Sequence, residues 1–289
     1  MTTDPAADAG AAAAVAGVAV RELHELGELQ EACRLFDEIW RRAAGDPPLN
    51  PELARALAHA GNYVAGAFLG ERLVGASVGF HADPVGQALH SHITGVAAGL
   101  QGGSVGFALK LHQRAWALAR GITRVVWTFD PLVARNAWFN LTKLAASPTA
   151  YLPDFYGPMR DALNAGDASD RLLVEWRLDA ERVATACAAT GPSVRSPDLA
   201  ALRAGGAAVA LGEDEQGRPV PGGAAPDAPL ALVHVPRDVE GLRGSDPPLA
   251  RHWRRAVRDA LGGRMAAGAS ATGFARAGVY LLERTGGGG

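Results

Sequence analysis

The feature that most constrains the fold of this chain is a glycine-rich turn joining a strand-like run to an amphipathic helix. Residues 88–96 form an apolar, strand-like run, residues 101–106 read Gln-Gly-Gly-Ser-Val-Gly, and a helical pattern follows from about Val105 to Arg120. Such a turn leaves several backbone N–H groups unpaired at the positive end of the helix dipole. The turn therefore predicts a phosphate site, although similar turns also occur where a strand packs closely on its own helix.

Two common phosphate-binding motifs do not fit this turn. A Walker loop needs a lysine and then Ser or Thr after its last glycine, whereas Gly106 is followed by Phe-Ala-Leu before Lys110. A dinucleotide fingerprint opens the first strand of its fold, whereas this turn comes after two predicted helices and a hairpin. A different phosphate-binding fold is therefore indicated.

Hydrophobic spacing predicts a mixed order of elements around the turn. Apolar residues at intervals of three and four predict a helix over 22–44, and Asn50 as N-cap with Pro51 at the first helical position predicts a second over 51–59. Two strand-like runs separated by a short gap with a glycine predict a hairpin. The remaining elements are the hairpin strands 63–69 and 73–80, a strand over 122–129, a helix over 136–146 and a strand over 172–178.

The chain divides into four stretches by composition. Residues 1–20 are alanine-rich, carry acidic residues where an export signal would be basic, and predict a flexible N-terminal tail. Residues 21–178 hold the elements above and predict one domain. Residues 179–228 drift into Ala, Gly and Pro, which predicts a connecting segment with one helix and a loose linker. Residues 229–289 predict a strand, a helix and a strand, either packed on the first domain or forming half of a second one.

The charge balance argues against a nucleic-acid partner. The chain has 28 Lys and Arg against 30 Asp and Glu, whereas a nucleic-acid surface needs clustered cations. Its two cysteines are too few for a disulfide framework and wrongly spaced for zinc, and we find no apolar run of membrane-spanning length. We expect a cytoplasmic protein. Lys110 and Lys143 are the only lysines, an arginine bias typical of a GC-rich bacterial genome.

The residues Gln101, Ser104 and Gly106 carry a resemblance to a known family. The turn resembles the Arg/Gln-x-x-Gly-x-Gly/Ala turn of the Gcn5-related N-acetyltransferase (GNAT) superfamily, which opens the main helix after two helices, a hairpin and a strand. The phrase Trp127-Thr-Phe-Asp-Pro-Leu132 is similar to one in a set of predicted acetyltransferases from bacteria and archaea. The resemblance covers roughly residues 22–178. It implies an α/β (α+β) fold with a mixed, mostly antiparallel central sheet flanked by helices, and here a C-terminal extension.

The resemblance also implies a cofactor, acetyl-CoA or another acyl-CoA. Its pyrophosphate would lie on the turn, and its pantetheine arm would run between strands 88–96 and 122–129 like an added strand. The N–H of Val96 would stabilise the oxyanion of the thioester carbonyl, and Asn136 would either cap its helix or bind the cofactor's amide. The turn residues assigned to the cofactor are Gln101, Gly102, Gly103, Ser104, Val105 and Gly106.

Transfer to an amine needs a base, for which the sequence offers three candidates. By period-two alternation His90, His92 and Thr94 share one face of their strand, so His90 and His92 are candidate bases; the alternative is that they make structural hydrogen bonds. Asp130 ends its strand and is a candidate base or amine anchor, or else a turn residue. His90 and His92 with Asp130 would be a weak metal set without a further spaced ligand, so no metal is predicted.

The general acid is less clearly marked. Leu141 stands where many family members carry a tyrosine that protonates the leaving thiolate, and Ser104 replaces the middle glycine of the turn. Tyr156, with Tyr151 as the second choice, lies in a loop after the helix and carries a phenol of suitable pKa, although loop aromatics often only pack.

The sequence therefore predicts an acyl-CoA-dependent N-acyltransferase acting on a small-molecule amine, for example in secondary metabolism. A decarboxylase of acyl thioesters on the same fold is a second hypothesis, because the helix tyrosine is missing. A non-catalytic binding or regulatory module is a third, favoured by Ser104 and Leu141. Homo-oligomerisation is left open.

Overall fold

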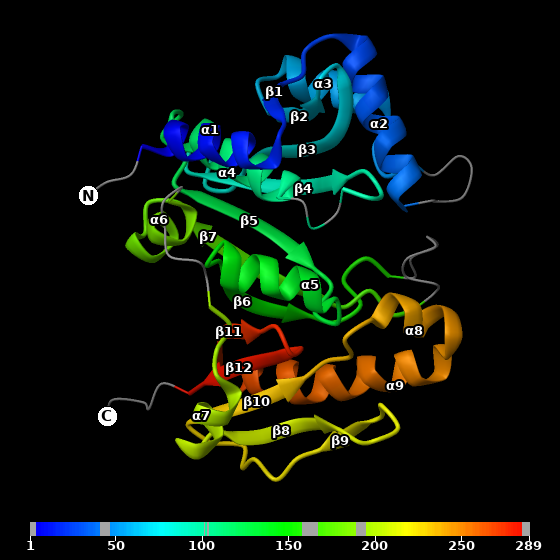
Figure 1. Cartoon of the computed structure of the whole chain (residues 1–289), viewed down its shortest axis with the longest axis vertical. Coiled ribbons are helices and arrows are strands. Elements are labelled where there is room, and N and C mark those ends of the chain that lie inside the picture. Colours follow the sequence, from blue (N-terminus) through cyan, green and yellow to red (C-terminus); the bar gives the residue numbers. More distant parts are fainter. Residues whose placement is uncertain are drawn as a thin grey trace. The chain divides into compact units, whose positions relative to one another are not determined.

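The chain folds into two compact units (Figure 1), which we describe separately. The computed structural model describes residues 4–40, 47–100, 102, 104–157, 167–188 and 195–284. The first unit comprises Met1–Trp127 and Arg177–Pro192, and the second comprises Thr128–Trp176 and Ser193–Gly289. This division differs from the predicted one, because residues 128–176 group with the C-terminal part of the chain.

The first unit contains a sheet in the strand order β1-β2-β3-β4-β5. Neighbouring strands are antiparallel except for β4 and β5, which are parallel. The predicted hairpin and the predicted strands over residues 88–96 and 122–129 are confirmed. The strands are β1 (Ala19–Glu22), β2 (Tyr63–Leu69), β3 (Arg72–Ala82), β4 (Ala88–Val96) and β5 (Arg124–Phe129), of which β5 continues into the second unit.

Helices pack on this sheet through apolar faces. The helices are α1 (Pro5–Ala16), α2 (Leu26–Trp40), α3 (Pro51–His59), α4 (Val105–Leu118) and α6 (Glu181–Cys187). Phe36 of α2 packs with Val64 and Val78 of the sheet, and Leu109 of α4 packs with Val74. Gly75 allows the close approach of α4, since an added Cβ would lie 3.1 Å from Leu109. α4 is thus held against β2 and β3, with its first turn at the end of β4.

The prediction of a flexible tail over residues 1–20 is wrong for the part that the structure describes. Asp4 caps α1 by accepting a hydrogen bond from the N–H of Ala6, Pro5 occupies the first turn, and Gly17 ends the helix in the left-handed conformation. Asp8 is buried beside Arg114 of α4, at 3.6 Å. Alanine's high helix propensity and this buried ion pair order the segment.

The second unit contains the antiparallel pair β6–β7 and a five-stranded sheet in the order β11-β12-β10-β8-β9. Its strands are β6 (Ser147–Leu152), β7 (Arg171–Arg177), β8 (Ala208–Glu213), β9 (Pro219–Pro221), β10 (Leu230–His234), β11 (Ser270–Ala275) and β12 (Val279–Glu283). Its helices are α5 (Ala134–Ala137), the π-helix η1 (Trp138–Lys143), α7 (Leu199–Ala204), α8 (Val239–Ser245), α9 (Pro247–Val257), the π-helix η2 (Arg258–Gly262) and α10 (Gly263–Ala266).

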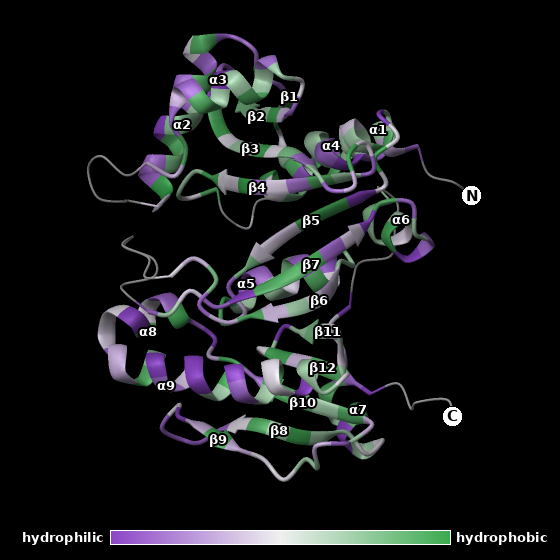
Figure 2. Cartoon of the chain, turned by 180° about the vertical axis from the view of Figure 1, so that it is seen from behind, coloured by the Kyte–Doolittle hydropathy of each residue, from purple (hydrophilic) through white to green (hydrophobic). Residues whose placement is uncertain are grey.

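The predicted connecting segment 179–228 is more ordered than expected. It contributes α6, α7, β8 and β9, and β8 pairs in parallel with β10. The strand, helix and strand predicted for residues 229–289 are present as β10, α9 and β12, and β11 was not foreseen. Arginines give α9 strongly hydrophilic bands (Figure 2), while Trp253 on its inner face is fully buried.

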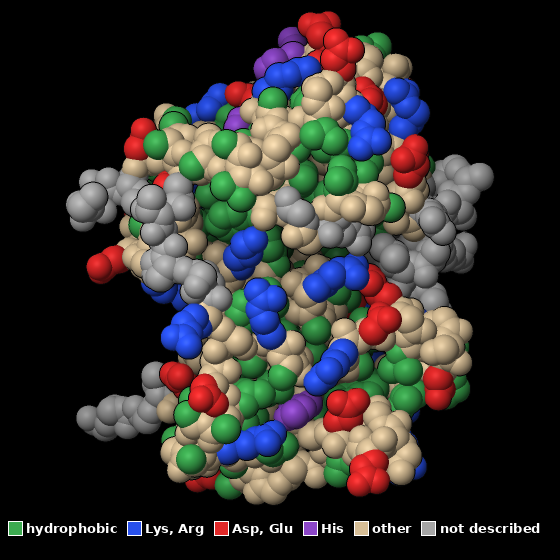
Figure 3. Space-filling view, viewed as in Figure 1, with side chains coloured by type: hydrophobic (Ala, Val, Ile, Leu, Met, Phe, Trp, Pro, Cys, Tyr) green, Lys and Arg blue, Asp and Glu red, His purple; other side chains and the backbone are tan. Residues whose placement is uncertain are grey.

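The surface carries charges of both signs. Figure 3 shows Lys and Arg side chains interspersed with Asp and Glu on the face in view, in keeping with the net charge of −2. In the part of the chain that the structure describes, no helix is long and apolar enough to cross a membrane.

Candidate functional site

The strand β4 ends its pairing with β5 after three residues. The parallel ladder joins Ala88 to Arg124, Leu89 to Val125 and His90 to Val126. On its other side β4 pairs with β3 as far as Val96, but the register shifts between Val78 and Gly79, so that His92 is an extra residue in a β-bulge. We call residues Ser91–Val96 the free edge of β4, because within the described residues no β5 partner faces them.

The free edge presents backbone groups away from β3. Ala97 donates its N–H to the carbonyl of Val74 at 2.9 Å, so residues 74 and 97 form a hydrogen-bonded pair. In an antiparallel ladder such pairs alternate with pairs whose N–H and C=O groups point outward. The next pair, Gly75 and Val96, is therefore of the outward kind. The N–H of Val96 points to the β5 side of β4, as a cofactor bound like an added strand requires.

The glycine turn lies between this free edge and α4. Gly102 (φ +87°) and Ser104 (φ +69°) have left-handed backbone conformations, and Ser104 is the N-cap of α4 without a side-chain capping bond. The amides of Val105 and Gly106 are in the first turn of α4, where the helix itself supplies no acceptor. Gln101 and Gly103 lie outside the described residues.

Gly106 is not required by the fold. It has no positive φ, and an added Cβ would meet only the Cγ2 atom of Val96, at an ordinary 3.8 Å. A glycine that neither conformation nor packing demands is suited to close approach of a ligand to the backbone. The residues present therefore fit an anionic group on the first turn of α4.

His90 and His92 come together as predicted. Their rings are 5.9 Å apart, and both contact the ring of Phe80, at 4.9 and 5.7 Å. Burial, and then the neighbouring His92 and Lys110, lower the pKa of His90 to about 4, so the ring is neutral at pH 7, although the lowered pKa also makes it a weaker base. Thr94 departs from the prediction: the bulge turns it to the other face, where its hydroxyl bonds Ser77 at 2.8 Å.

Lys110 is a buried residue of this region that the sequence did not single out. It extends from α4 to the sheet, where its Nζ donates to the Oγ of Ser91 at 2.8 Å and the Oε1 of Gln113 at 3.1 Å. Nζ also lies 4.0 Å from the ring centre of Trp127. The side chain is 4% exposed, and burial lowers the pKa of Lys110 to about 7. The signal available was that Lys110 is one of only two lysines.

Asp130 does not have the environment of a general base, which corrects that prediction. Its carboxylate accepts two hydrogen bonds from Arg254, each 2.8 Å, and one from Arg243 at 2.5 Å. Burial alone would raise its pKa, but these guanidinium groups outweigh burial and hold the pKa of Asp130 well below its usual range. With Asp167, also bound to Arg254 at 3.0 Å, it forms a buried ion cluster in the second unit.

The other predicted residues of the second unit have mixed outcomes. The Tyr156 hydroxyl is 3.2 Å from the Oγ1 of Thr128, which directly follows Trp127 in β5, and the side chain is exposed. Tyr151 donates to Asp170 at 2.7 Å; burial and this carboxylate raise its pKa far above the usual range, so it is not a suitable acid. Asn136 is not an N-cap, because α5 begins earlier, with Val133 in that position.

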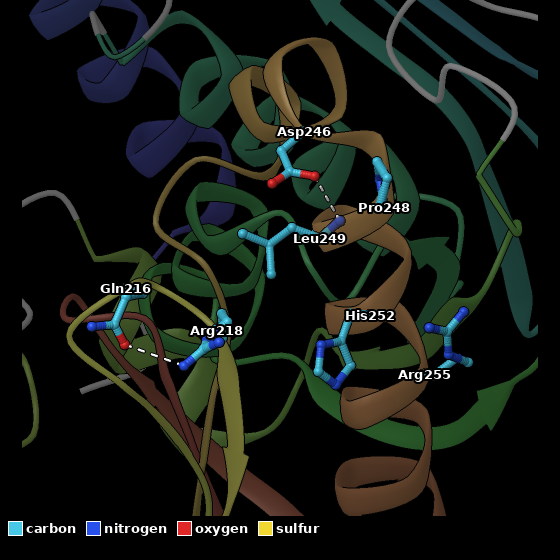
Figure 4. Close-up of a pocket in the computed structure, with 7 residues that line it drawn as sticks. All are labelled: Gln216, Arg218, Asp246, Pro248, Leu249, His252 and Arg255. Atoms are coloured by element: carbon cyan, nitrogen blue, oxygen red, sulfur yellow. Dashed lines mark hydrogen bonds between the residues drawn. The ribbon is translucent and has the colours of Figure 1, made fainter.

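A separate hollow in the second unit lies beside α9 (Figure 4). Two of its polar side chains are engaged in local structure: Asp246 caps α9 through the N–H of Leu249 at 3.0 Å, and Arg218 binds Asp214. Among the residues with described positions, no group of three or more His, Cys, Asp or Glu side chains is placed to hold a metal. The groups suited to acyl transfer are those of β4 and α4.

No protein-family model and no curated protein sequence matches this chain. Several solved structures that resemble part of it are acetyltransferases. A putative GNAT-family acetyltransferase from Desulfovibrio desulfuricans is 14% identical with a TM-score of 0.43, covering 56% of this chain and 99% of that one. A putative acetyltransferase from Salmonella typhimurium, solved with acetyl-CoA, is 15% identical with a TM-score of 0.46, covering 57% and 96%.

A third structure is the aminoglycoside 6'-N-acetyltransferase from Enterococcus faecium, 13% identical with a TM-score of 0.43, covering 56% of this chain and 98% of that one. Each match spans little more than half of this chain. Identities this low say nothing of the acceptor substrate.

Proposed function

We propose that this protein is an acyl-CoA-dependent N-acyltransferase of the GNAT type, which moves an acyl group, most simply acetyl, to a small-molecule amine. The observation that carries the proposal is the outward-pointing amide of Val96 on the free edge of β4, with the first turn of α4 beside it. The Cγ2 atom of Val96 is only 3.8 Å from the position of a Gly106 Cβ, so the two backbone sites are neighbours. One extended, phosphate-bearing ligand can use both.

Residues of α4 and β4 bind the cofactor and carry out the transfer in this proposal. The N-terminal amides of α4 bind the pyrophosphate, with Ser104 placing its hydroxyl at the same turn. The free edge of β4 orients the pantetheine arm. The Val96 amide, predicted to stabilise the thioester oxygen, instead binds the arm at its pyrophosphate end, because Val96 lies beside α4 and the thioester lies at the other end of the edge, near His90 and Ser91. The neutral ring of His90, backed by His92, accepts the proton of the attacking amine.

Calorimetric titration with acetyl-CoA tests the cofactor site. Gly106→Glu places a carboxylate in the first turn of α4 and should abolish binding that the wild type shows at micromolar concentration. Gly27→Glu is the matched control, because Gly27 is also the second residue of a helix, is exposed, and has no atom within 4 Å of an added Cβ.

The outcome distinguishes the competing functions. No binding by the wild type would refute the proposal and favour a non-catalytic module. Binding followed by release of carbon dioxide from malonyl-CoA, without transfer to any amine, would instead favour the acyl-thioester decarboxylase. The decarboxylase remains the second candidate function because Leu141, which is 6% exposed in η1, carries no phenol that could protonate a leaving thiolate.

A further inference from the structure

Lys110 lies where the pairing of β4 with β5 ends. Its two sheet contacts are Ser91 and Trp127, the residues that directly follow the last bonded pair, His90 and Val126. The free edge of β4 therefore has the first turn of α4 at one end and the Lys110 ammonium at the other. A thioester whose pyrophosphate lies on α4 and whose arm follows the free edge has its reactive end near Lys110.

Burying the ammonium of Lys110 without a carboxylate partner lowers the stability of the fold. No carboxylate of the described residues pairs with its ammonium, which is held by a hydroxyl, an amide oxygen and an aromatic ring. A buried cation without a counter-charge destabilises a fold by several kcal/mol as a rule. The Nε2 of Gln113 is also buried at this place, without a hydrogen-bond partner among the described residues. A desolvated ammonium and an unpaired amide nitrogen therefore lie together at this point.

We propose that Lys110, acting through the hydroxyl of Ser91, supplies the proton that the departing coenzyme A thiolate takes up. This inference rests on the proposed acyltransferase function and supplies the general acid that Leu141 does not provide. Ser91 is the catalytic residue of the pair, because its hydroxyl meets the sulfur. Lys110 orients this hydroxyl and replaces the proton that it gives up. The hydroxyl accepts a hydrogen bond from Nζ and keeps its own proton free to donate.

The transfer step forms one bond, breaks one bond and moves one proton to sulfur. The amine nitrogen forms a bond to the acyl carbon while the carbon–sulfur bond breaks, and the electron pair of that bond goes to sulfur. The Ser91 hydroxyl gives its proton to sulfur and takes one from Nζ, which leaves a neutral lysine. The proton lost by the attacking amine passes to His90 or to water, and solvent returns a proton to Lys110. The products are the amide and the free thiol.

The opposite faces of β4 keep acid and base apart. Ser91 lies on the α4 face with Lys110, whereas His90, one residue earlier, lies on the other face with Phe80. Of the groups around Lys110, Ser91, Gln113 and Trp127 do not titrate near neutral pH. His90 is the titratable neighbour whose pKa the lysine lowers. Neutral imidazole on one face and ammonium on the other is the arrangement that concerted acid and base catalysis needs.

The test uses acetyl-CoA as donor and hydroxylamine as acceptor, because hydroxylamine is mostly unprotonated at neutral pH and needs no deprotonation before it attacks. Lys110→Met and Ser91→Ala should each lower kcat about 100-fold, a typical loss for a general acid, with the KM for acetyl-CoA unchanged. Lys110→Arg keeps the charge but cannot release a proton, so it should not restore kcat. Lys143→Met, which removes the other lysine, should behave as wild type.

The pH profile separates proton donation from packing. Wild-type kcat should fall as the pH rises through the pKa of Lys110, because the acid form is then lost, and the variants should lack this limb. Variants with wild-type kcat, or with a parallel profile, overturn the inference. So does a wild type that binds acetyl-CoA but transfers nothing to hydroxylamine. Failure of acetyl-CoA to bind the wild type would instead remove the proposed function itself.

Discussion

Replacing the buried lysine should stabilise the protein. In Lys110→Met the side chain keeps its approximate length and loses its charge. The lysine's pKa is 10.5 in the unfolded chain and about 7 in the fold, a difference that corresponds to about 5 kcal/mol of destabilisation when both states are charged. Methionine removes this penalty but leaves Ser91 and Gln113 without their donor, at about 1–2 kcal/mol each. The net gain is therefore about 2 kcal/mol at pH 6.

The sign of the pH dependence follows from proton binding. Between the folded and unfolded pKa values the unfolded chain binds the extra proton, so wild-type stability rises with pH across this window. The penalty is complete below pH 7 and gone above the unfolded value of 10.5. The advantage of the methionine variant should accordingly shrink by about 2–3 kcal/mol between pH 6 and pH 9, and it should change sign there.

Two measurements check this reasoning. Urea unfolding of wild type and Lys110→Met at several pH values gives the difference in the free energy of unfolding, with Lys143→Met as the control. Selective labelling of lysine with ¹⁵N gives a spectrum of two side chains, so the titration of Lys110 can be followed directly. A difference in stability that does not vary with pH, or a lysine titrating near 10.5, would refute the assignment of a desolvated ammonium.

Two further predictions concern the buried ion pairs. Asp130→Asn leaves Arg254 and Arg243 without their carboxylate and should destabilise the second unit by about 3 kcal/mol at pH 7, measured by urea unfolding. Because the folded pKa of Asp130 is lowered, its contribution is complete above its unfolded value and is lost in strong acid, where variant and wild type should converge. Asp8→Ala removes the partner of Arg114 and should cost about 2 kcal/mol and speed hydrogen exchange of the α1 amides; unchanged exchange would contradict the docking of α1.

Local patterns were sufficient where neighbouring residues decide the structure. The hairpin β2–β3, the cap of α3 by Asn50 and the course of β4 into the glycine turn could all be predicted from spacing and capping chemistry. The cap at Asp4 and Pro5 was equally local, but the alanine-rich composition after it was interpreted as a tail. Alanine is weakly apolar but is the best helix former, and here the second property determined the structure.

Contacts between residues far apart in the sequence could not be predicted from local patterns. Asp130 was a plausible base by its place at a strand end, and only the fold shows that Arg243 and Arg254, over a hundred residues later, neutralise it. The bulge at His92 is of the same kind: it has no local signature, yet it moves Thr94 to the opposite face. Similarly, β8 appeared to be linker because its partner, β10, lies about twenty residues further on.

The contrast between the buried cations supports a chemical role for Lys110. Arg243 and Arg254 are each held by carboxylates, and Arg114 has Asp8 together with the carbonyl of Leu178. These guanidinium groups serve as fixed partners of the carboxylates in the core. By contrast, Lys110 is a buried cation for which the described residues offer no carboxylate partner, and its proton is labile near neutral pH. A fold that needed only a positive charge beside Ser91 would be served by arginine; a site that must release and recover a proton requires lysine.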